Sequence, residues 1–202
     1  MQELREQNQS FLFPDDWDVS KFDEWSFYRG QFSKLAAANL NCSACEANIR
    51  CAQCNSGRVA GTKGIDFLAI ESNKVCWQIE VKDYRQTLKS SFVFLADEVA
   101  LKVRDTLACL VVARTNSNDA KENELAKRAI GCTKINIVLH LELPPANSTL
   151  HSRRTRRAAV QQRLRQLVKS IDRCARVLDK SSCESVAWNA VSYTHLTLPT
   201  KA

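Results

Sequence analysis

The chain has 202 residues, of which 45% are hydrophobic and 25% are charged, and its net charge is +7. This is the composition of one ordinary globular domain with a proper core. No stretch reaches the roughly 18 apolar residues of a membrane span, and the polar start is no signal peptide, so we expect no membrane partner. Nine cysteines in such a chain predict reduced thiols or a metal site in a cytoplasmic protein.

The positive charge is concentrated in one segment. Residues 151–180 hold ten Lys/Arg and two Asp, a net charge of +8, which leaves −1 for the rest of the chain. This concentration indicates a polyanionic partner more strongly than the total charge does. The alternative is a solvated helix face, although ten basic residues in thirty exceed what solubility requires.

Residues 1–29 form an aromatic-rich N-terminal segment that the sequence predicts to be irregular. Pro14 and the acidic pair Asp15-Asp16 separate its aromatic residues. Since no row of Lys or Arg lies between them, we expect these rings to pack over the core and not to stack on bases. The helix formers of residues 31–40 predict the first core helix.

Four cysteines follow in the pattern C-x2-C-x5-C-x2-C, namely Cys42, Cys45, Cys51 and Cys54. Each C-x2-C unit can present two thiolates to one ion, so the four sulfurs would complete a closed structural zinc site. An iron–sulfur cluster is the competing interpretation, because four thiolates also bind such clusters. The remaining alternative is four free thiols in a loop.

Residues 65–82 predict a β-hairpin whose register decides whether a polar site exists. Two arms rich in β-branched and aromatic residues flank the polar turn 72–74. Alternation places Gln78, Glu80 and Lys82 on one face of the second arm. A three-residue loop places Asp66 opposite Glu80 on that face, whereas a two-residue loop places it on the apolar face.

Two carboxylates and a lysine would then converge on one face of the hairpin. A partly buried carboxylate pair is costly unless a cation neutralises it. Mg²⁺ is the natural cation, because it binds a few carboxylates together with water and phosphate oxygens. The alternative is an exposed polar face with an ordinary Glu–Lys pair.

Asp66, Glu80 and Lys82 form the pattern D-x13-E-x-K on adjacent strands, with a helix after them. This pattern resembles the PD-(D/E)xK superfamily of phosphodiesterases, which includes restriction endonucleases, Holliday-junction resolvases and repair nucleases. The resemblance covers about residues 30–143, the span of the superfamily's αβββαβ core. Ile65 stands where the family pattern has proline.

The resemblance implies that Asp66 and Glu80 bind catalytic Mg²⁺ or Mn²⁺, with the main-chain carbonyl of Val81 as a further ligand. It also implies that Lys82 orients or activates the attacking water. Accessory positions complete the predicted site: the helical glutamate of some members matches Glu24 or Glu46, and Gln78 and Lys102 are further candidates.

The chain after the hairpin predicts a helix over residues 96–114, with Glu98, Lys102 and Asp105 on one face. That face either borders the metal site, with Lys102 near a phosphate, or forms a solvated salt-bridge ladder. Asp119 predicts the cap of a short helix that ends at Gly131. Residues 134–143 predict a strand in which His140 lies on the polar side with a structural role.

A linker over residues 146–154 precedes a predicted basic amphipathic helix over residues 156–178. Its apolar stripe is expected to pack on the core or on a partner, including a second copy of the chain. The arginines on its other faces could follow a nucleic-acid backbone; in and beside this helix they are Arg153, Arg154, Arg156, Arg157, Arg163 and Arg165. Residues 191–202 resemble a translated sequencing-adapter tail.

The sequence thus predicts an α/β (α+β) fold with a mixed sheet and a restriction-endonuclease-like core. The four-cysteine knuckle is inserted into residues 30–143, and residues 144–190 add the linker and basic helix. The predicted function is a metal-dependent nuclease of bacterial defence, with DNA favoured as substrate. The alternatives are a non-enzymatic zinc-knuckle module that binds nucleic acid, and an interaction protein of a defence or toxin system.

Overall fold

Two β-sheets form the centre of the fold. The computed structural model describes residues 1–35, 61–86, 94–144 and 150–192. The main sheet has the order β3-β4-β5-β6-β7, in which β3, β4 and β5 are antiparallel and β6 and β7 run parallel to β5. Its strands are β3 (Asp18–Lys21), β4 (Phe67–Glu71), β5 (Val75–Asp83), β6 (Lys134–Glu142) and β7 (Arg176–Leu178). The small antiparallel sheet has the order β1-β2-β8 and consists of β1 (Gln2–Glu6), β2 (Gln9–Phe13) and β8 (Asn189–Ser192).

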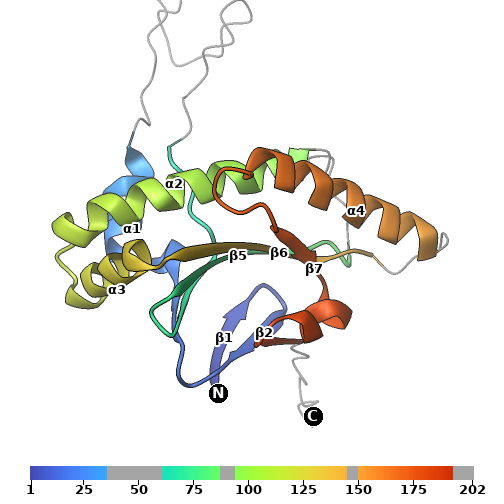
Figure 1. Ribbon diagram of the computed structural model, residues 1–202, viewed down its shortest axis with the longest axis horizontal. Helices are drawn as coiled ribbons and strands as arrows, with labels where there is room; N and C mark the ends of the chain where they lie inside the picture. Colours follow the sequence, from blue (N-terminus) through green and yellow to red (C-terminus); the bar gives the residue numbers. More distant parts are fainter. Residues whose placement is uncertain (36–60, 87–93, 145–149, 193–202) are drawn as a thin grey trace, which may run out of the picture.

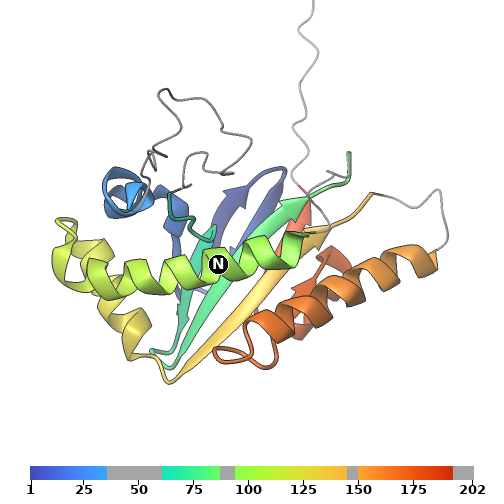
Figure 2. The same cartoon turned by 90° about the horizontal axis from the view of Figure 1, so that it is seen from above.

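The elements are arranged in three layers, with the main sheet in the middle (Figure 1). Helices α2 and α4 lie beside each other across one face of that sheet, as the view from above shows (Figure 2). The small sheet covers the other face. The described α-helices are α1 (Ser26–Gly30), α2 (Leu95–Asn116), α3 (Ala120–Gly131) and α4 (Leu150–Leu167), and none of them is long and apolar enough to cross a membrane.

Each face of the main sheet has its own core. Under the helices, Leu68 and Ile70 of β4 pack with Val99 and Val103 of α2. Under the small sheet the core is aromatic, and Phe11, Phe13, Trp17, Trp77 and Trp188 meet there. Because both faces are covered, the strands of the main sheet are buried on both sides.

The N-terminal segment is more regular than the sequence predicts. Strands β1, β2 and β3 and short helical turns occupy most of residues 1–35. Strand β2 pairs with β8, so its partner lies almost at the other end of the described chain. The expectation that the aromatic residues pack in the core is confirmed, since Phe11 and Phe22 are fully buried.

The predicted helix over residues 31–40 is wrong in its described part. Helix α1 ends at Gly30, and only a 3-10 turn, Phe32–Lys34, follows before the described residues stop at 35. Phe32 is buried in the helix-side core, and this tertiary contact outweighs the helical propensity of the segment.

The two helices predicted after the hairpin are confirmed. Helix α2 buries Val99, Val103 and Leu110. The carboxylate of Asp119 accepts hydrogen bonds from the amides of Lys121 and Glu122 and so caps α3, as predicted.

Helix α4 begins at Leu150, inside the predicted linker 146–154, and ends at Leu167 and not near residue 178, so it lies earlier in the chain and is shorter than the predicted basic helix. The carboxylate of Asp172 accepts hydrogen bonds from the amides of Cys174 (2.7 Å) and Ile137 (2.9 Å), which turns the chain into β7. Val160 and Leu164 belong to the helix-side core, so the stripe packs on the core, while Leu167 is exposed. The predicted second copy or partner on this helix remains a prediction.

The observed fold confirms the mixed α/β class and not the specific αβββαβ core. The strand that flanks β4 is β3, which precedes α1, whereas the restriction-endonuclease-like order places every strand after the first helix. His140 also differs from its predicted polar setting. It is fully buried in the aromatic core, with its ring centroid 5.0 Å from that of Phe11 and its Nε2 atom 3.2 Å from the carboxylate of Glu142.

Candidate functional site

The hairpin has the register that brings Asp66 and Glu80 together. Glu71 faces Val75 and Phe67 faces Ile79, so Asp66, directly before β4, continues this register opposite Glu80. The three-residue loop is confirmed, and Ser72 and Asn73 adopt left-handed backbone conformations within it. Both carboxylates therefore face α2, on the side of the sheet that also carries Leu68 and Ile70.

Two lysines compensate the charge of these carboxylates. The Nζ atom of Lys82 lies 2.9 Å from an oxygen of Glu80, and the Nζ atom of Lys102 lies 2.6 Å from the same oxygen. Lys102 also lies 3.7 Å from Asp66. It reaches the pair from α2, so this face of the helix borders the two carboxylates. Glu98, one turn before Lys102, lies 3.8 Å from Lys82. We define Asp66, Glu80, Lys82 and Lys102 as the charge cluster.

The geometry also explains how Asp66 is held. One of its carboxylate oxygens accepts a hydrogen bond of 2.7 Å from the amide of Val81. The carbonyl of Val81 accepts a hydrogen bond from the side chain of Gln7, at 3.1 Å. The carbonyl that the resemblance implies as a metal ligand is thus already engaged by the small-sheet layer.

Burial changes the acidity of the cluster. Burial, followed by the nearby charge of Asp66, raises the pKa of Glu80 to about 7, although both lysines oppose this change. Burial likewise raises the pKa of Asp66. Burial by itself would lower the pKa of Lys102, but the charges of Glu80 and Asp66 outweigh it and leave that pKa above its ordinary value. Near neutral pH, Glu80 is therefore poised between its neutral and charged forms.

Two polar side chains at the cluster have atoms that lack a hydrogen-bond partner among the described residues. Gln78 is fully buried, and neither its amide oxygen nor its amide nitrogen has a hydrogen-bond partner there. The second carboxylate oxygen of Glu80 also has none. Buried polar groups normally have partners, so these atoms point to a small ligand, an ion or water at this position.

A third carboxylate that sequence reasoning missed lies near Asp66. The amide of Phe22 donates a 2.9 Å hydrogen bond to the carbonyl of Asp66, which places the 3-10 turn Phe22–Glu24 beside the cluster. Burial, and then the charge of Asp66, raises the pKa of the next residue, Asp23, to about 6. The predicted candidate Glu24 instead forms an ion pair with Lys21. The adjacent pair Asp23-Glu24 was the available sequence signal, but only the turn shows which member faces the cluster.

The segment that leads into β4 is anchored by α2. The amide of Lys63 donates to the carboxylate of Asp105, and the amide of Ile65 donates to the hydroxyl of Thr106. Between them, the amide of Gly64 donates a 2.6 Å hydrogen bond to the hydroxyl of Tyr28. A Cβ atom at Gly64 would lie 2.9 Å from the ring of Phe22, so this close approach requires glycine.

The donor set for a metal is partly present. Asp66 and Glu80 supply the hard oxygen ligands that Mg²⁺ prefers. Within the described ranges, no group of three or more His, Cys, Asp or Glu residues could hold a metal ion. The predicted zinc or iron–sulfur ligands Cys42, Cys45, Cys51 and Cys54, together with Glu46, lie outside the described residues.

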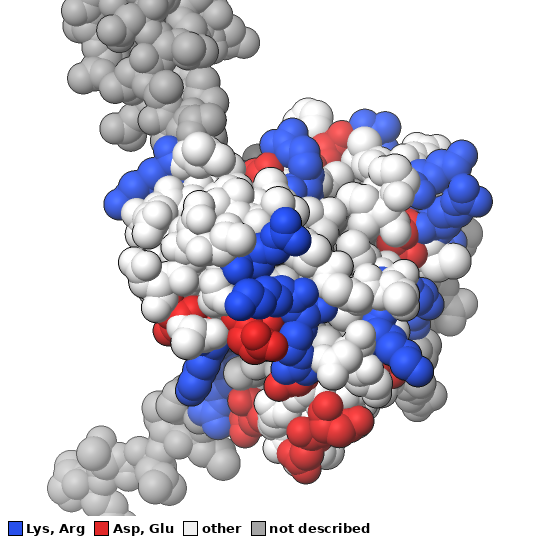
Figure 3. Space-filling view, turned by 60° about the vertical axis from the view of Figure 1, so that its left-hand side comes forward, with Lys and Arg blue, Asp and Glu red and all other residues white. Residues whose placement is uncertain are grey.

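The predicted nucleic-acid-binding arginines differ in their contacts with the rest of the fold. Arg157 contacts Asp179 at 2.5 Å and Arg163 contacts Asp97 at 2.7 Å, so both attach α4 to the rest of the fold. Arg156 and Arg165 are exposed on α4, and Arg153 and Arg154 contribute backbone to its first turns. Elsewhere, acidic side chains adjoin basic ones near the centre of the face shown in Figure 3.

Comparison with known proteins gives one informative match. The chain is 30% identical over 159 residues to a cysteine–tRNA ligase of Neisseria meningitidis serogroup A, a match that covers 75% of this chain and 22% of that protein. The chain thus spans about a fifth of the length of the curated relative it matches. No protein-family model and no solved structure matches the chain.

This match corrects the predicted function. The matching protein is named a ligase, so the prediction of a nuclease, a hydrolase of phosphodiester bonds in bacterial defence, is wrong. The charge cluster resembles a nuclease site in residue type and spacing, but such a motif is short and does not by itself determine a reaction. The name of the relative also refers to tRNA. This agrees with the prediction of a nucleic-acid partner, although not with DNA in particular.

Proposed function

We propose that this chain is an RNA-binding domain that holds tRNA for a ligase reaction. The observation that carries the proposal is the similarity of three quarters of the chain to part of a cysteine–tRNA ligase. Because the match covers 22% of that protein, the proposed role is a contribution to tRNA binding and not the complete ligation.

The charge distribution supports this proposal. Residues 151–180 carry a net charge of +8, and α4 presents Arg156 and Arg165 to solvent. Lys169 and Arg173, just after the helix, are exposed as well. Exposed cations of this kind neutralise backbone phosphates and release counterions, which provides affinity without reading the base sequence.

Two metal sites belong to the proposal. Asp66 and Glu80 would bind one hydrated Mg²⁺, which supplies positive charge to an RNA phosphate near Lys82. The buried oxygen of Glu80 that has no partner within the described chain supports this assignment. The four cysteines Cys42, Cys45, Cys51 and Cys54 would bind a structural zinc ion, with an iron–sulfur cluster as the alternative.

The test is a binding measurement on the full chain by fluorescence anisotropy. Its ligands are a transcript of a cysteine-accepting tRNA and a DNA duplex with the same number of phosphates. We expect tighter binding of the tRNA, with an affinity that falls steeply between about 50 and 200 mM salt. A Lys127→Gln variant, altered at an exposed position of α3, serves as the control for total charge. Absence of tRNA binding, or equal affinity for the DNA, would contradict the proposal.

A further inference from the structure

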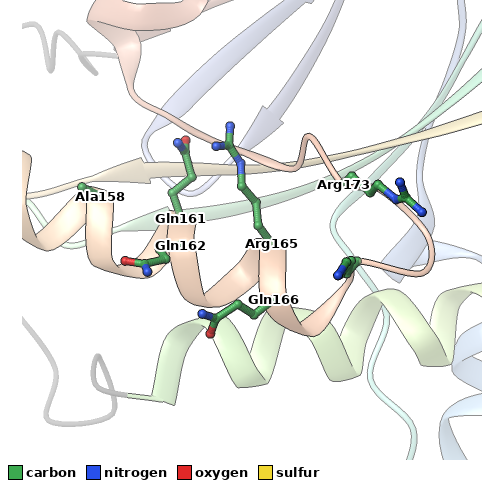
Figure 4. Close-up of a pocket in the computed structure, with 7 residues that line it drawn as sticks. Ala158, Gln161, Gln162, Arg165, Gln166 and Arg173 are labelled. Carbon is green, nitrogen blue, oxygen red and sulfur yellow. The ribbon is translucent and has the colours of Figure 1, made fainter.

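A groove runs along α4 and the segment of residues 168–175 that follows it (Figure 4). Its volume is about 460 Å³. Three glutamine amides and three cationic groups line it, from Gln161, Gln162, Arg165, Gln166, Lys169 and Arg173. We call this surface the glutamine–arginine groove.

The positive charge of the glutamine–arginine groove is not balanced by acidic side chains among its described lining residues. None of the described side chains that line it is a carboxylate. The nearby acid, Asp172, is buried and uses its oxygens on the amides of Ile137 and Cys174, so it faces away from the groove. An anionic ligand would therefore meet cations here with no acidic competitor.

Part of the groove is held in place before any ligand binds. The Nε atom of Arg165 donates a 2.8 Å hydrogen bond to the carbonyl of Ala175, and the amide oxygen of Gln161 accepts a 3.0 Å hydrogen bond from the amide of Val177. These bonds attach the helix to the chain that enters β7. The remaining N–H groups of Arg165 can donate to a ligand, and little side-chain entropy is lost because the side chain is already oriented.

The amides add a second kind of recognition. Gln162 and Gln166 are exposed, lie one turn apart on α4 and belong to the same wall of the groove. A carboxamide carries both donors and an acceptor, which match the edge of a nucleic-acid base. Phosphate alone would not require an acceptor, so the mixture of amides and cations fits a ligand with both phosphates and base edges.

We propose that the glutamine–arginine groove binds a single-stranded segment of RNA. Arg165, Lys169 and Arg173 contact its phosphates, and Gln162 and Gln166 hydrogen-bond its base edges. Unstacked loops present those edges, whereas an A-form duplex hides them in a deep, narrow groove. This inference rests on the proposed function and deepens it, since it assigns the groove to a loop or an end of the tRNA.

The experiment uses the full chain and three probes: an unstructured RNA 12-mer, a 12-base-pair RNA duplex and the tRNA transcript. Anisotropy titrations over a range of salt concentrations compare the wild type with Gln162→Ala/Gln166→Ala and with Lys169→Gln/Arg173→Gln. Lys127→Gln is the control, because Lys127 is exposed on α3 and does not line the groove. Thermal unfolding of each variant checks that these exposed substitutions leave the fold intact.

We expect the wild type to bind the 12-mer at least about tenfold more tightly than the duplex. The double amide variant should lose about tenfold in affinity for the 12-mer, with an unchanged salt dependence, because it removes hydrogen bonds and no charge. The Lys169→Gln/Arg173→Gln variant should lower the slope of log K against log salt by about 1.4, for two phosphates on a single strand.

Two outcomes overturn the inference, and they differ from failure of the proposed function. Duplex binding as tight as 12-mer binding, or an amide variant that binds the 12-mer like the wild type, overturns the groove assignment while tRNA binding stands. Absence of binding to all three probes overturns the proposed function as well.

Discussion

The charge cluster and the glutamine–arginine groove are both built from charged side chains, but they differ in compensation. In the cluster, Lys82 and Lys102 meet Glu80 at 2.9 and 2.6 Å, and Glu80 is 1% exposed. In the groove, Lys169 and Arg173 are exposed and no described carboxylate lines the surface. Burial accounts for the difference, because an uncompensated charge is costly in the interior and tolerable in water.

This comparison separates two kinds of ligand. The cluster already contains its counter-charges, so its two carboxylates suit a small cation or a proton and not a polyanion. The groove has none, so a polyanion can bind there without displacing a part of the protein.

Removal of one cation from the cluster should have the largest effect. Lys102→Met keeps the aliphatic volume but leaves Glu80 and Asp66 with less compensation, and we expect a loss of about 3 kcal/mol in the free energy of unfolding at pH 8. The loss should shrink below pH 6, where Glu80 is protonated. Urea denaturation measures it, with Lys127→Met on the exposed side of α3 as the matched control. Equal stability of the two variants at pH 8 would show that Lys102 compensates nothing.

The protonation of Glu80 should make stability depend on pH. Its pKa is about 7 in the fold, above the ordinary glutamate value of 4.5, so the folded state binds more protons between these limits. Stability should therefore fall as pH rises from 5 to 8, by roughly 2 kcal/mol. Glu80→Gln should flatten this dependence, whereas Glu124→Gln, at an exposed position of α3, should not. A wild type that gains stability from pH 5 to 8 would contradict the buried, partly neutral Glu80.

Mg²⁺ should stabilise the wild type at pH 8, where Glu80 is charged. At a concentration ten times the dissociation constant, the gain in the free energy of unfolding is about 1.4 kcal/mol. Asp66→Asn should abolish this gain, and Glu124→Gln should preserve it. Thermal unfolding with and without Mg²⁺ is the measurement. An equal gain in the Asp66→Asn protein would place the cation elsewhere.

The smallest expected effect distinguishes two neighbouring arginines on α4. Arg157 forms an ion pair with Asp179, and the side chains are 32% and 21% exposed, so Arg157→Gln should cost about 0.5–1 kcal/mol of stability. Arg156→Gln should leave stability unchanged and lower the salt slope of tRNA binding by at most about 0.7. Denaturation and anisotropy measurements on both variants test this division. If Arg156→Gln lowered the stability and Arg157→Gln lowered the salt slope, Arg156 would be the structural residue and Arg157 the one that contacts RNA.

Local patterns determined much of this protein. Alternation along β5 predicted that Gln78, Glu80 and Lys82 share one face, and the polar turn 72–74 left two registers for Asp66; the observed pairing of Glu71 with Val75 selects the one opposite Glu80. Helical spacing predicted α2, and Asp119 predicted the start of α3. These features depend on neighbours along the chain, so periodicity and capping chemistry are sufficient to predict them.

Only the tertiary structure decided the remaining features. The end of α4 depends on a hydrogen bond between Asp172 and the amide of Ile137, 35 residues earlier, and β2 finds its partner β8 almost at the other end of the described chain. Lys102 completes the charge cluster because α2 crosses over β5, and Asp23 lies near Asp66 because a turn packs against the hairpin. Such contacts join residues far apart in sequence, and local periodicity carries no information about which distant segment will cover a given face.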